Sequence, residues 1–269
     1  MPDWPAGGGG SVAELGANVG ASTGVQLTTG SPAHTKGSWA EVTSSSPFTC
    51  SGFILTINFA LATYLVDVGI GAAGSEQVLV ENIHYSGQTL VPMSMYFPVR
   101  IPAGSRIAVR SQGSATGSVT STTMYLINEG FQGPPGRNRV ITYGAVTADS
   151  GGTSIDPGGT LHTKGSWVQI TASTSAAHKG LAMVLGSQNN ATMSGITFFY
   201  DIAVGASGSE QILVPNWRVT SSVNETIAPR DTPFFPVDIP AGSRLAVRAS
   251  SNNTDATDRL LDVVLYGLT

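Results

Sequence analysis

The chain has 269 residues, a formal net charge of −4 and only 11% charged residues. This weakly acidic composition argues against a broad basic surface, so we expect no nucleic-acid partner. The longest apolar stretch, from Phe53 to Val68, is too short and too polar to span a bilayer, so we also expect no membrane association. The single cysteine, Cys50, excludes an internal disulfide.

Residues 1–13 are predicted to form an extended, glycine-rich arm, because two prolines are followed by four consecutive glycines, Gly7 to Gly10. A segment of this composition is disordered when it is alone in water. We therefore expect a neighbouring subunit to hold the arm. The first residues lack the basic and apolar regions of a signal peptide, so we expect the protein to be made in the cytoplasm.

An internal repeat organises the rest of the chain. Residues 97–110 read Phe-Pro-Val-Arg-Ile-Pro-Ala-Gly-Ser-Arg-Ile-Ala-Val-Arg, and residues 235–248 repeat this motif with changes only at the fourth and eleventh positions. The proline and glycine of each copy predict a tight turn, and the alternation of polar and apolar residues after it predicts a strand. The chain is therefore one unit made twice.

The repeat predicts an all-β fold of two tandem β-sandwich or jelly-roll domains that follow the extended arm. Each half contains roughly eight short apolar runs separated by turn residues, the pattern of such folds. We place the first domain at residues 14–131 and the second at residues 142–269. A Gly-Pro-Pro-Gly sequence marks residues 132–141 as the linker between them.

One aspartate in each half lies between apolar residues of a predicted strand, on the face that the arginines of the repeated motif also occupy. Opposite charges on one sheet face predict an ion pair in each half. We favour a structural role for these pairs, with a ligand or subunit contact as the alternative. The predicted pairs join Asp67 to Arg106 or Arg110, and Asp201 to Arg244 or Arg248.

The sequence predicts no catalytic residues and no metal or other cofactor. His34 and His162 open a repeated His-Thr-Lys-Gly-Ser-Trp sequence, but no nucleophile elbow or comparable signature accompanies them. The four histidines lack metal-ligand spacing, and there are no cysteine pairs. We therefore expect a protein that is not an enzyme, and we interpret the repeated sequence as a strand entry that buries its tryptophan.

Trp217 has no aromatic counterpart in the first half, where Ile83 takes its place. Two interpretations are open for this side chain. The one we favour is packing against the core, as is usual for tryptophan. The alternative is an exposed ring on which a sugar stacks.

The repeated motifs together resemble a module that is common in structural proteins of tailed bacteriophages. The resemblance covers residues 16–131 and 144–269, and it depends on the His-Thr-Lys-Gly-Ser-Trp sequence, on Val-Asp-Val-Gly-Ile-Gly-Ala-Ala-Gly-Ser-Glu-Gln and on the motif of residues 97–110. It implies a virion component, either a capsid decoration, cement or head-fibre protein or a tail-associated protein. It brings no catalytic residues, and the glycine-rich arm lies outside the module.

We therefore expect a non-enzymatic structural protein of the virion, made in the host cytoplasm, that acts through adhesion between subunits. The expected partners are other capsid or tail proteins and further copies of the chain, with a trimer as the first expectation from the resemblance. The alternative is a carbohydrate-binding, receptor-recognition module of a fibre, with a host surface glycan as its ligand.

Overall fold

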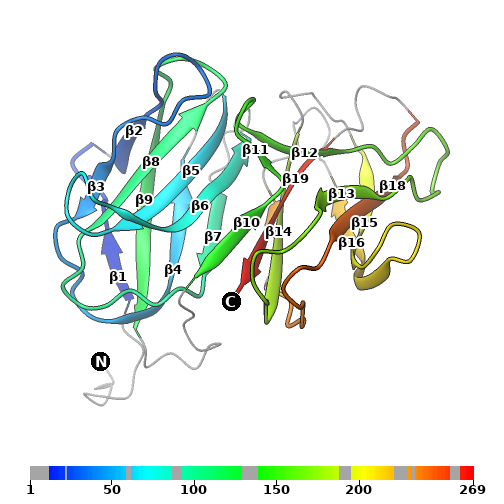
Figure 1. The fold of residues 1–269 in the computed structure, drawn as a ribbon. Helices are drawn as coiled ribbons and strands as arrows, with labels where there is room; N and C mark the ends of the chain where they lie inside the picture. The colour runs from blue at the N-terminus through cyan, green and yellow to red at the C-terminus, as the bar shows by residue number, and fades with distance from the viewer. Residues whose placement is uncertain are drawn as a thin grey trace, which may run out of the picture.

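The computed structural model describes residues 12–21, 23–58, 62–86, 93–128, 139–187, 195–220, 230–231, 234–254 and 261–269. Within these ranges every regular element is a β-strand, and the strands form antiparallel sheets. The predicted all-β fold with two similar sandwich-like halves is confirmed, and the halves lie side by side (Figure 1). Residues 1–11 of the predicted arm lie outside the described residues, as do residues 132–138 of the predicted linker.

The described residues of the first half form nine strands in two sheets. The order of one sheet is β1-β9-β4-β7, with β2 also paired to β9, and we call it the β4 sheet. The order of the other is β3-β8-β5-β6, and we call it the β5 sheet. The strands are β1 (Val12–Leu15), β2 (Val25–Thr28), β3 (Ala40–Thr43), β4 (Cys50–Ile57), β5 (Thr63–Ile70), β6 (Gln77–Ser86), β7 (Met93–Phe97), β8 (Ile107–Gly113) and β9 (Val119–Asn128).

The second half repeats this arrangement. The β14 sheet has the order β11-β12-β19-β14-β17, with β10 also paired to β19, and the β15 sheet has the order β13-β18-β15-β16. The strands are β10 (Val140–Tyr143), β11 (Ala145–Val146), β12 (Gly151–Ile155), β13 (Val168–Thr171), β14 (Gly180–Ser187), β15 (Thr197–Val204), β16 (Gln211–Thr220), β17 (Arg230–Asp231), β18 (Leu245–Ser251) and β19 (Leu261–Leu268).

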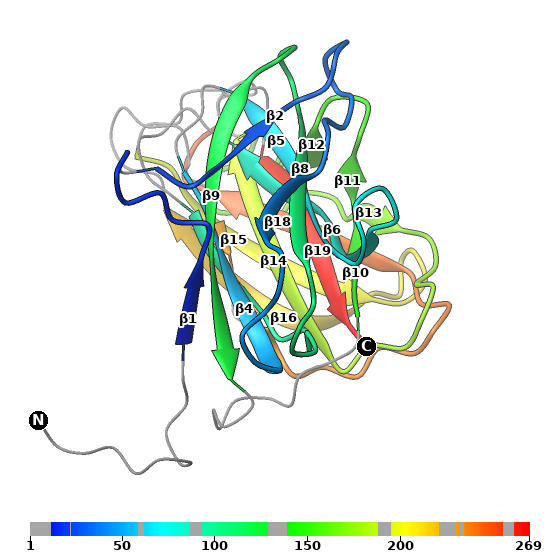
Figure 2. The same ribbon diagram turned by 90° about the vertical axis from the view of Figure 1, so that its left-hand side faces the viewer.

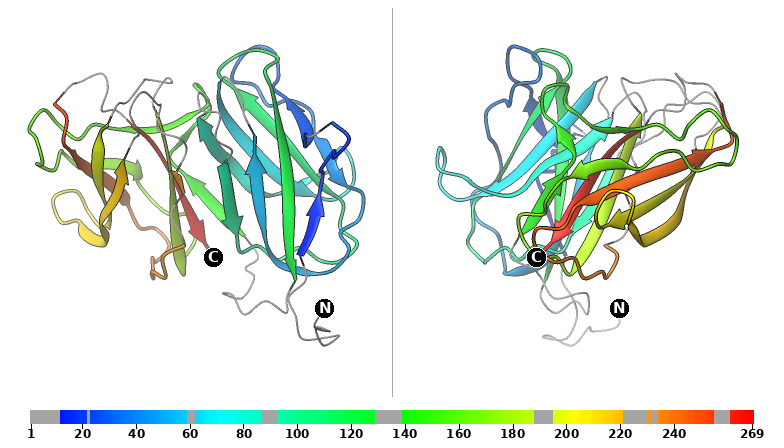
Figure 3. Two further views of the ribbon diagram at one scale, coloured as in Figure 1. Left: turned by 180° about the vertical axis from the view of Figure 1, so that it is seen from behind. Right: turned by 45° about the vertical axis from the view of Figure 1, so that its right-hand side comes forward.

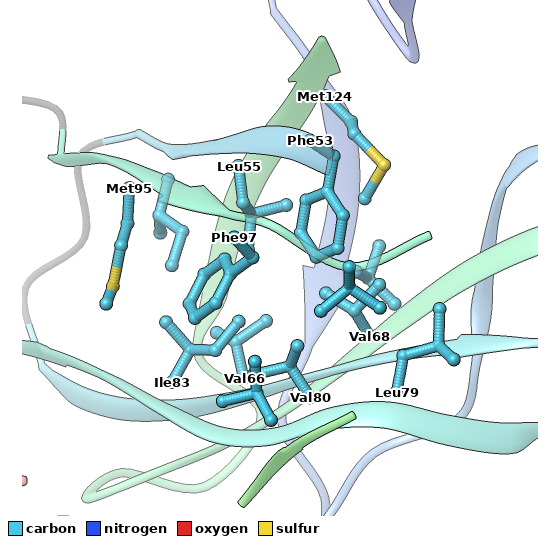
Figure 4. Close-up of a cluster of buried hydrophobic side chains, with 14 of the residues drawn as sticks. Phe53, Leu55, Val66, Val68, Leu79, Val80, Ile83, Met95, Phe97 and Met124 are labelled. Carbon is cyan, nitrogen blue, oxygen red and sulfur yellow. The ribbon is translucent and has the colours of Figure 1, made fainter. Parts of the chain in front are cut away.

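Alternate residues of each strand build the core of the first half. Phe53 and Leu55 of β4 point toward Val66 and Val68 of β5, and Phe97 of β7 lies beside Phe53 with ring centroids 5.4 Å apart (Figure 4). All five side chains are at most 1% exposed. Burying such a side chain stabilises the fold by about 1.5–3 kcal/mol, so the period-2 pattern of these strands is the main determinant of the sandwich.

The two halves are joined by a continuous apolar contact. The β14 sheet uses both faces: Leu181 and Met183 of β14 enter the core of the second half, whereas Ala182 and Val184 join the core cluster of the first half. β6 lies against β10 and β14 at this contact (Figure 3). Because both faces are buried, β14 is apolar at nearly every position rather than at every second one.

Tyr266 of β19 is the centre of this contact. Its hydroxyl accepts a hydrogen bond from the backbone N of His84 at 2.9 Å and donates one to the backbone O of Asn82 at 3.1 Å. Its ring lies edge-on to Phe97, with ring centroids 5.8 Å apart. The ring of Phe234 also lies edge-on to Phe97, with ring centroids 6.4 Å apart. Phe97 of the first half is therefore clamped between two aromatic rings of the second half.

A buried carboxyl group in β19 makes the stability of the second half depend on pH. Asp262 is 5% exposed, and burial, with a contribution from nearby Asp149, raises its pKa to about 7. The folded state therefore favours the neutral carboxyl. The stability that the neutral form contributes is fully present below the ordinary pKa of about 4 and is lost as the pH rises through 7.

Asp262→Asn is expected to become more stable than the wild type as the pH rises. We expect its advantage in the free energy of unfolding to grow by about 1–3 kcal/mol between pH 4 and pH 8, since one unit of pKa difference is worth about 1.4 kcal/mol. The amide oxygen can still accept the hydrogen bond from the backbone of Gly152. Urea unfolding of both proteins across this pH range measures the difference, and an advantage that does not change with pH contradicts the prediction.

Candidate functional site

A buried aspartate in each half gathers two cations, and we call each group an ion cluster. In the first half Asp67 accepts hydrogen bonds from Lys36 Nζ at 2.7 Å and from Arg110 Nε at 2.9 Å. The backbone N of Asn82 donates a third bond, at 2.9 Å, to the carboxylate oxygen that Lys36 also contacts. The side chain of Asp67 is only 3% exposed, so the carboxylate is partnered on both oxygens.

The second half repeats the ion cluster with almost the same geometry. Lys164 Nζ lies 2.8 Å and Arg248 Nε 2.9 Å from the carboxylate of Asp201. The backbone N of Asn216 donates to the same carboxylate at 2.9 Å. Burial alone would raise the pKa of Asp201, but the hydrogen bonds from Lys164, Asn216 and Arg248 lower it overall, so the group is held as a carboxylate.

Strand register and a β-bulge position each cluster. Asp67 of β5 lies directly opposite Arg110 of β8. Asn82 is the bulged residue of β6 and has a positive φ of 54°, which aims its N–H at the carboxylate. Asn216 of β16 has the same role, with a φ of 50°. The geometry of the clusters is thus set by the backbone of three neighbouring strands.

The His-Thr-Lys-Gly-Ser-Trp loop covers the outer face of the sheet and completes the cluster. It brings in Lys36, and it lays Trp39 against Arg110, whose guanidinium carbon is 4.5 Å from the ring centroid. In the second half Arg248 lies 4.3 Å from the ring of Trp167. The expectation that these tryptophans are buried in the core is wrong. They are half-buried, because they stack on the cluster arginines outside the sandwich.

The structure selects one of the two arginines considered for each ion pair. Arg106 does not reach Asp67, because it precedes β8 and lies beside the turn that joins β5 to β6. It pairs instead with Glu41 at 2.7 Å and Glu76 at 2.9 Å. Arg244 likewise pairs with Glu210 at 3.0 Å and not with Asp201.

Lys36 and Lys164 are the cluster residues that sequence reasoning missed. Burial lowers the pKa of Lys36, and the neighbouring Asp67 opposes that change. The available signal was the return of the whole six-residue sequence, lysine included, in the second half. Each carboxylate is saturated with donors, so neither cluster offers a free base for proton transfer. We interpret both clusters as structural.

The surface beside the clusters differs between the halves. In the first half it is covered: His34 Nδ1 is 3.1 Å from Ser150 Oγ, and Gln112 Nε2 donates to the backbone O of Thr147 at 2.7 Å. In the second half the same region is open and forms a hollow of about 620 Å³, which we call the Phe199 hollow. It is lined by His162, Lys164, Thr197, Phe199, Asn216, Ser250, Ser251 and Asn252.

Trp217 does not line the Phe199 hollow. Its ring is half-buried against the core of the second half and lies edge-on to Phe235, with centroids 5.3 Å apart. Phe199, which is 39% exposed, is instead the aromatic side chain of the hollow.

Within the described residues, no group of three or more His, Cys, Asp or Glu side chains could hold a metal ion. Over the same residues, no helix has the length and hydrophobicity needed to cross a membrane.

Neither a protein-family model nor the sequence of a curated protein matches this chain. Three solved structures share part of its chain path. PNGF-II in its P21 crystal form has 8% sequence identity and a TM-score of 0.37, and the match covers 95% of this chain and 65% of that chain. The tandem CBM22 domains of Xyn10C from Paenibacillus barcinonensis have 14% identity and a TM-score of 0.27, with 97% of this chain and 92% of that chain covered. The Gt strain of infectious bursal disease virus has 12% identity and a TM-score of 0.25, with 97% of this chain and 77% of that chain covered. This chain spans 65% and 58% of two PNGF-II chains. TM-scores this low support no argument about family or function.

Proposed function

We propose that this chain is a non-enzymatic structural protein of a bacteriophage virion that acts by adhesion between subunits. The observation that carries the proposal is the contact between the halves, in which the first sandwich buries Ala182, Val184 and Tyr266 on the outer face of the β14 sheet. The saturated ion clusters add rigidity and offer no free base. The virion itself enters through the resemblance of the repeated motifs to phage structural modules.

The proposed partners are other proteins of the capsid exterior or the tail, together with further copies of this chain. An extended arm suits such a role, because it can reach a neighbouring subunit. Ordering the arm costs about 1–2 kcal/mol per residue, so its contacts on the particle have to be extensive.

The purified chain is expected to bind preassembled particles that lack it, and deletion of residues 1–11 is expected to weaken this binding at least tenfold. The reason is that the arm's contacts are lost while both sandwiches remain intact. Sedimentation of particles with increasing amounts of protein measures the affinity. Ala73→Asp, at an exposed position in the turn after β5, is the matched control and should bind like the wild type. Unchanged binding of the truncated chain contradicts the arm mechanism, and no binding of the full chain contradicts the virion role.

A second candidate function is the recognition of a host glycan, and the Phe199 hollow is the observation that favours it. An exposed aromatic ring surrounded by amide and hydroxyl side chains, here Asn216, Asn252 and Thr197, can stack on a sugar and hydrogen-bond its hydroxyl groups. Binding to a glycan array that is lost in Phe199→Ala but kept in Trp217→Ala would support this function. Loss of binding only in Trp217→Ala would mean that the sugar stacks on Trp217, the ring considered from the sequence.

A further inference from the structure

The second half leaves open a surface that the first half has covered. Each position can be matched between the halves: Leu65 and Phe199 stand two residues before the cluster aspartate, and Ile83 and Trp217 follow the bulged asparagine. In the first half Leu65, Ile83, Phe97 and Val99 are all 0% exposed. Their counterparts in the second half are less buried. Phe199 is 39% exposed, and Trp217, Phe235 and Val237 are half-buried.

The second half itself provides the cover in the first half. Phe234 and Tyr266 clamp Phe97, and the loop of residues 147–150 lies over His34 and Gln112 beside the first ion cluster. Phe234 immediately precedes Phe235, the counterpart of Phe97. The covering surface is therefore the outer face of the β14 sheet with the loop between β11 and β12.

This covering surface also has a free counterpart, on the outer face of the β4 sheet. Ile54 pairs with Tyr96 on β7 and with Tyr125 on β9, and Tyr125 pairs with Glu14 on β1, so these residues form one row across four strands. Figure 2 shows β1, β9 and β4 of this sheet next to one another. The matching row on the β14 sheet includes Ala182, Tyr266 and Thr142, with Phe234 in the place of Tyr96.

The free row keeps the aromatic residues of the covering row. Tyr96 stands immediately before Phe97, as Phe234 stands immediately before Phe235. The strand partner of Tyr125 is the exposed Glu14, and the strand partner of Tyr266 is Thr142. Glu14 and Thr142 occupy matching positions, each two residues before a glycine, Gly16 or Gly144. Two exposed valines flank the row: Val12, 59% exposed, is the counterpart of buried Val140, and Val19, 88% exposed, is the counterpart of Thr147.

We propose that these two free surfaces bind each other between copies of this chain. Tyr96 and Tyr125 of one copy would clamp Phe235 of the next, as Phe234 and Tyr266 clamp Phe97 within one chain. The loop that carries Val19 would cover the Phe199 hollow. The occupant of the hollow is then a second copy of the chain, because the molecule already contains one example of the same contact.

Charges on the two surfaces are complementary. Arg218 is exposed and takes the place of His84, whose backbone N binds Tyr266. Glu14 is exposed and takes the place of Thr142, which is the strand partner of Tyr266. Within the chain, the hydroxyl of Thr142 donates to the backbone O of Glu81 on β6. A contact between copies would therefore set Glu14 beside β16, where Pro215 takes the place of Glu81 and Arg218 follows three residues later, so that an acid and a base share the rim. Such rim charges favour the correct register.

The contact joins two unlike surfaces, so each added copy leaves one of each surface free. Assemblies of this kind either close into a ring or grow as an open chain. This inference rests on the proposed adhesion function and names one partner for it. A closed ring of three copies would agree with the trimer expected from the sequence resemblance.

Two variants of the full chain test the inference by complementation. Phe199→Asp removes the hollow surface, and Tyr125→Asp removes the β4-sheet surface. In sedimentation-velocity experiments over a concentration series, the wild type is expected to form oligomers. Each variant alone is expected to remain monomeric, with at least a tenfold loss of affinity. A mixture of the two is expected to form a dimer and nothing larger, because one good surface of each kind remains.

Two controls keep the result interpretable. Ala73→Asp, at an exposed position in the turn after β5, should oligomerise like the wild type. At concentrations where the wild type is monomeric, the unfolding midpoints of both surface variants should match that of the wild type, because association itself raises the midpoint. If Tyr125→Asp does not fold, Tyr125→Ser replaces it. A monomeric wild type, an oligomer that survives either variant or a mixture that stays monomeric overturns the inference. A monomer that binds an oligosaccharide in the hollow also overturns it. If particles bind the wild type and both variants equally, the proposed function stands and only this inference fails.

Discussion

Replacing Asp67 by alanine is expected to lower the free energy of unfolding by about 3–5 kcal/mol, the usual cost of breaking a buried ion pair from one side. The change leaves Lys36, Arg110 and the backbone N of Asn82 without their shared acceptor. The side chains of Lys36 and Arg110 are 20% and 30% exposed, so water can reach them in part. We therefore expect the loss near the lower end of the range. Urea unfolding followed by tryptophan fluorescence measures it.

Asp238→Ala is the matched control for this prediction. Asp238 also pairs with a lysine, Lys179, but the two side chains are 78% and 62% exposed. An exposed pair contributes little, so the control should change the free energy of unfolding by less than about 1 kcal/mol. Asp201→Ala should behave like Asp67→Ala, since the second cluster has the same donors. Equal effects for Asp67→Ala and Asp238→Ala contradict the structural role of the clusters.

The sequence was sufficient to predict the architecture because the repeat and the two-residue period are local signals. The repeated motif around Gly104 and Gly242 shows the duplication directly, and the alternation in residues 106–110 assigns one face of β8 to the core. An Asp–Arg pair in each half was predictable for the same reason, since alternate residues share a face.

The choice between the two arginines was not predictable from the sequence. It depends on the register of β5 against β8, which places Arg110 opposite Asp67 and Arg106 beyond the end of β5. Lys36 reaches the cluster from a loop far away in the chain, so no local period shows it. The arginine that supports the half-buried ring of Trp39 is equally remote in sequence.

The sequence indicates that β14 is buried on both faces, but it does not identify the surface that covers the second face. Residues 181–185 are apolar at every position, which indicates a strand buried on both faces. Such a run does not tell which surface covers the second face. Only the three-dimensional arrangement shows that Ala182 and Val184 pack on the first half, and that the matching residues of the first half, Ile54 and Thr56, are only half-buried.

Tyr266→Ala is expected to lower the free energy of unfolding by about 3–5 kcal/mol, because it leaves a cavity between the halves. The change removes the ring that contacts Phe97 and both hydrogen bonds of the hydroxyl to β6. Tyr266→Phe keeps the ring and should cost about 1–3 kcal/mol, since the backbone N of buried His84 loses its acceptor. Urea unfolding of the full chain measures both values.

Tyr125→Ala is the matched control, since it removes the same side chain from the equivalent position of the first half. Tyr125 is half-buried on a free sheet face, so we expect the unfolding free energy of the monomer to fall by less than about 1 kcal/mol. The two tyrosines should thus separate cleanly: Tyr266 holds the halves of one chain together, whereas Tyr125 should matter only where copies meet. If Tyr125→Ala destabilises the monomer as much as Tyr266→Ala, the β4-sheet face is part of the fold itself and is not a surface for another copy.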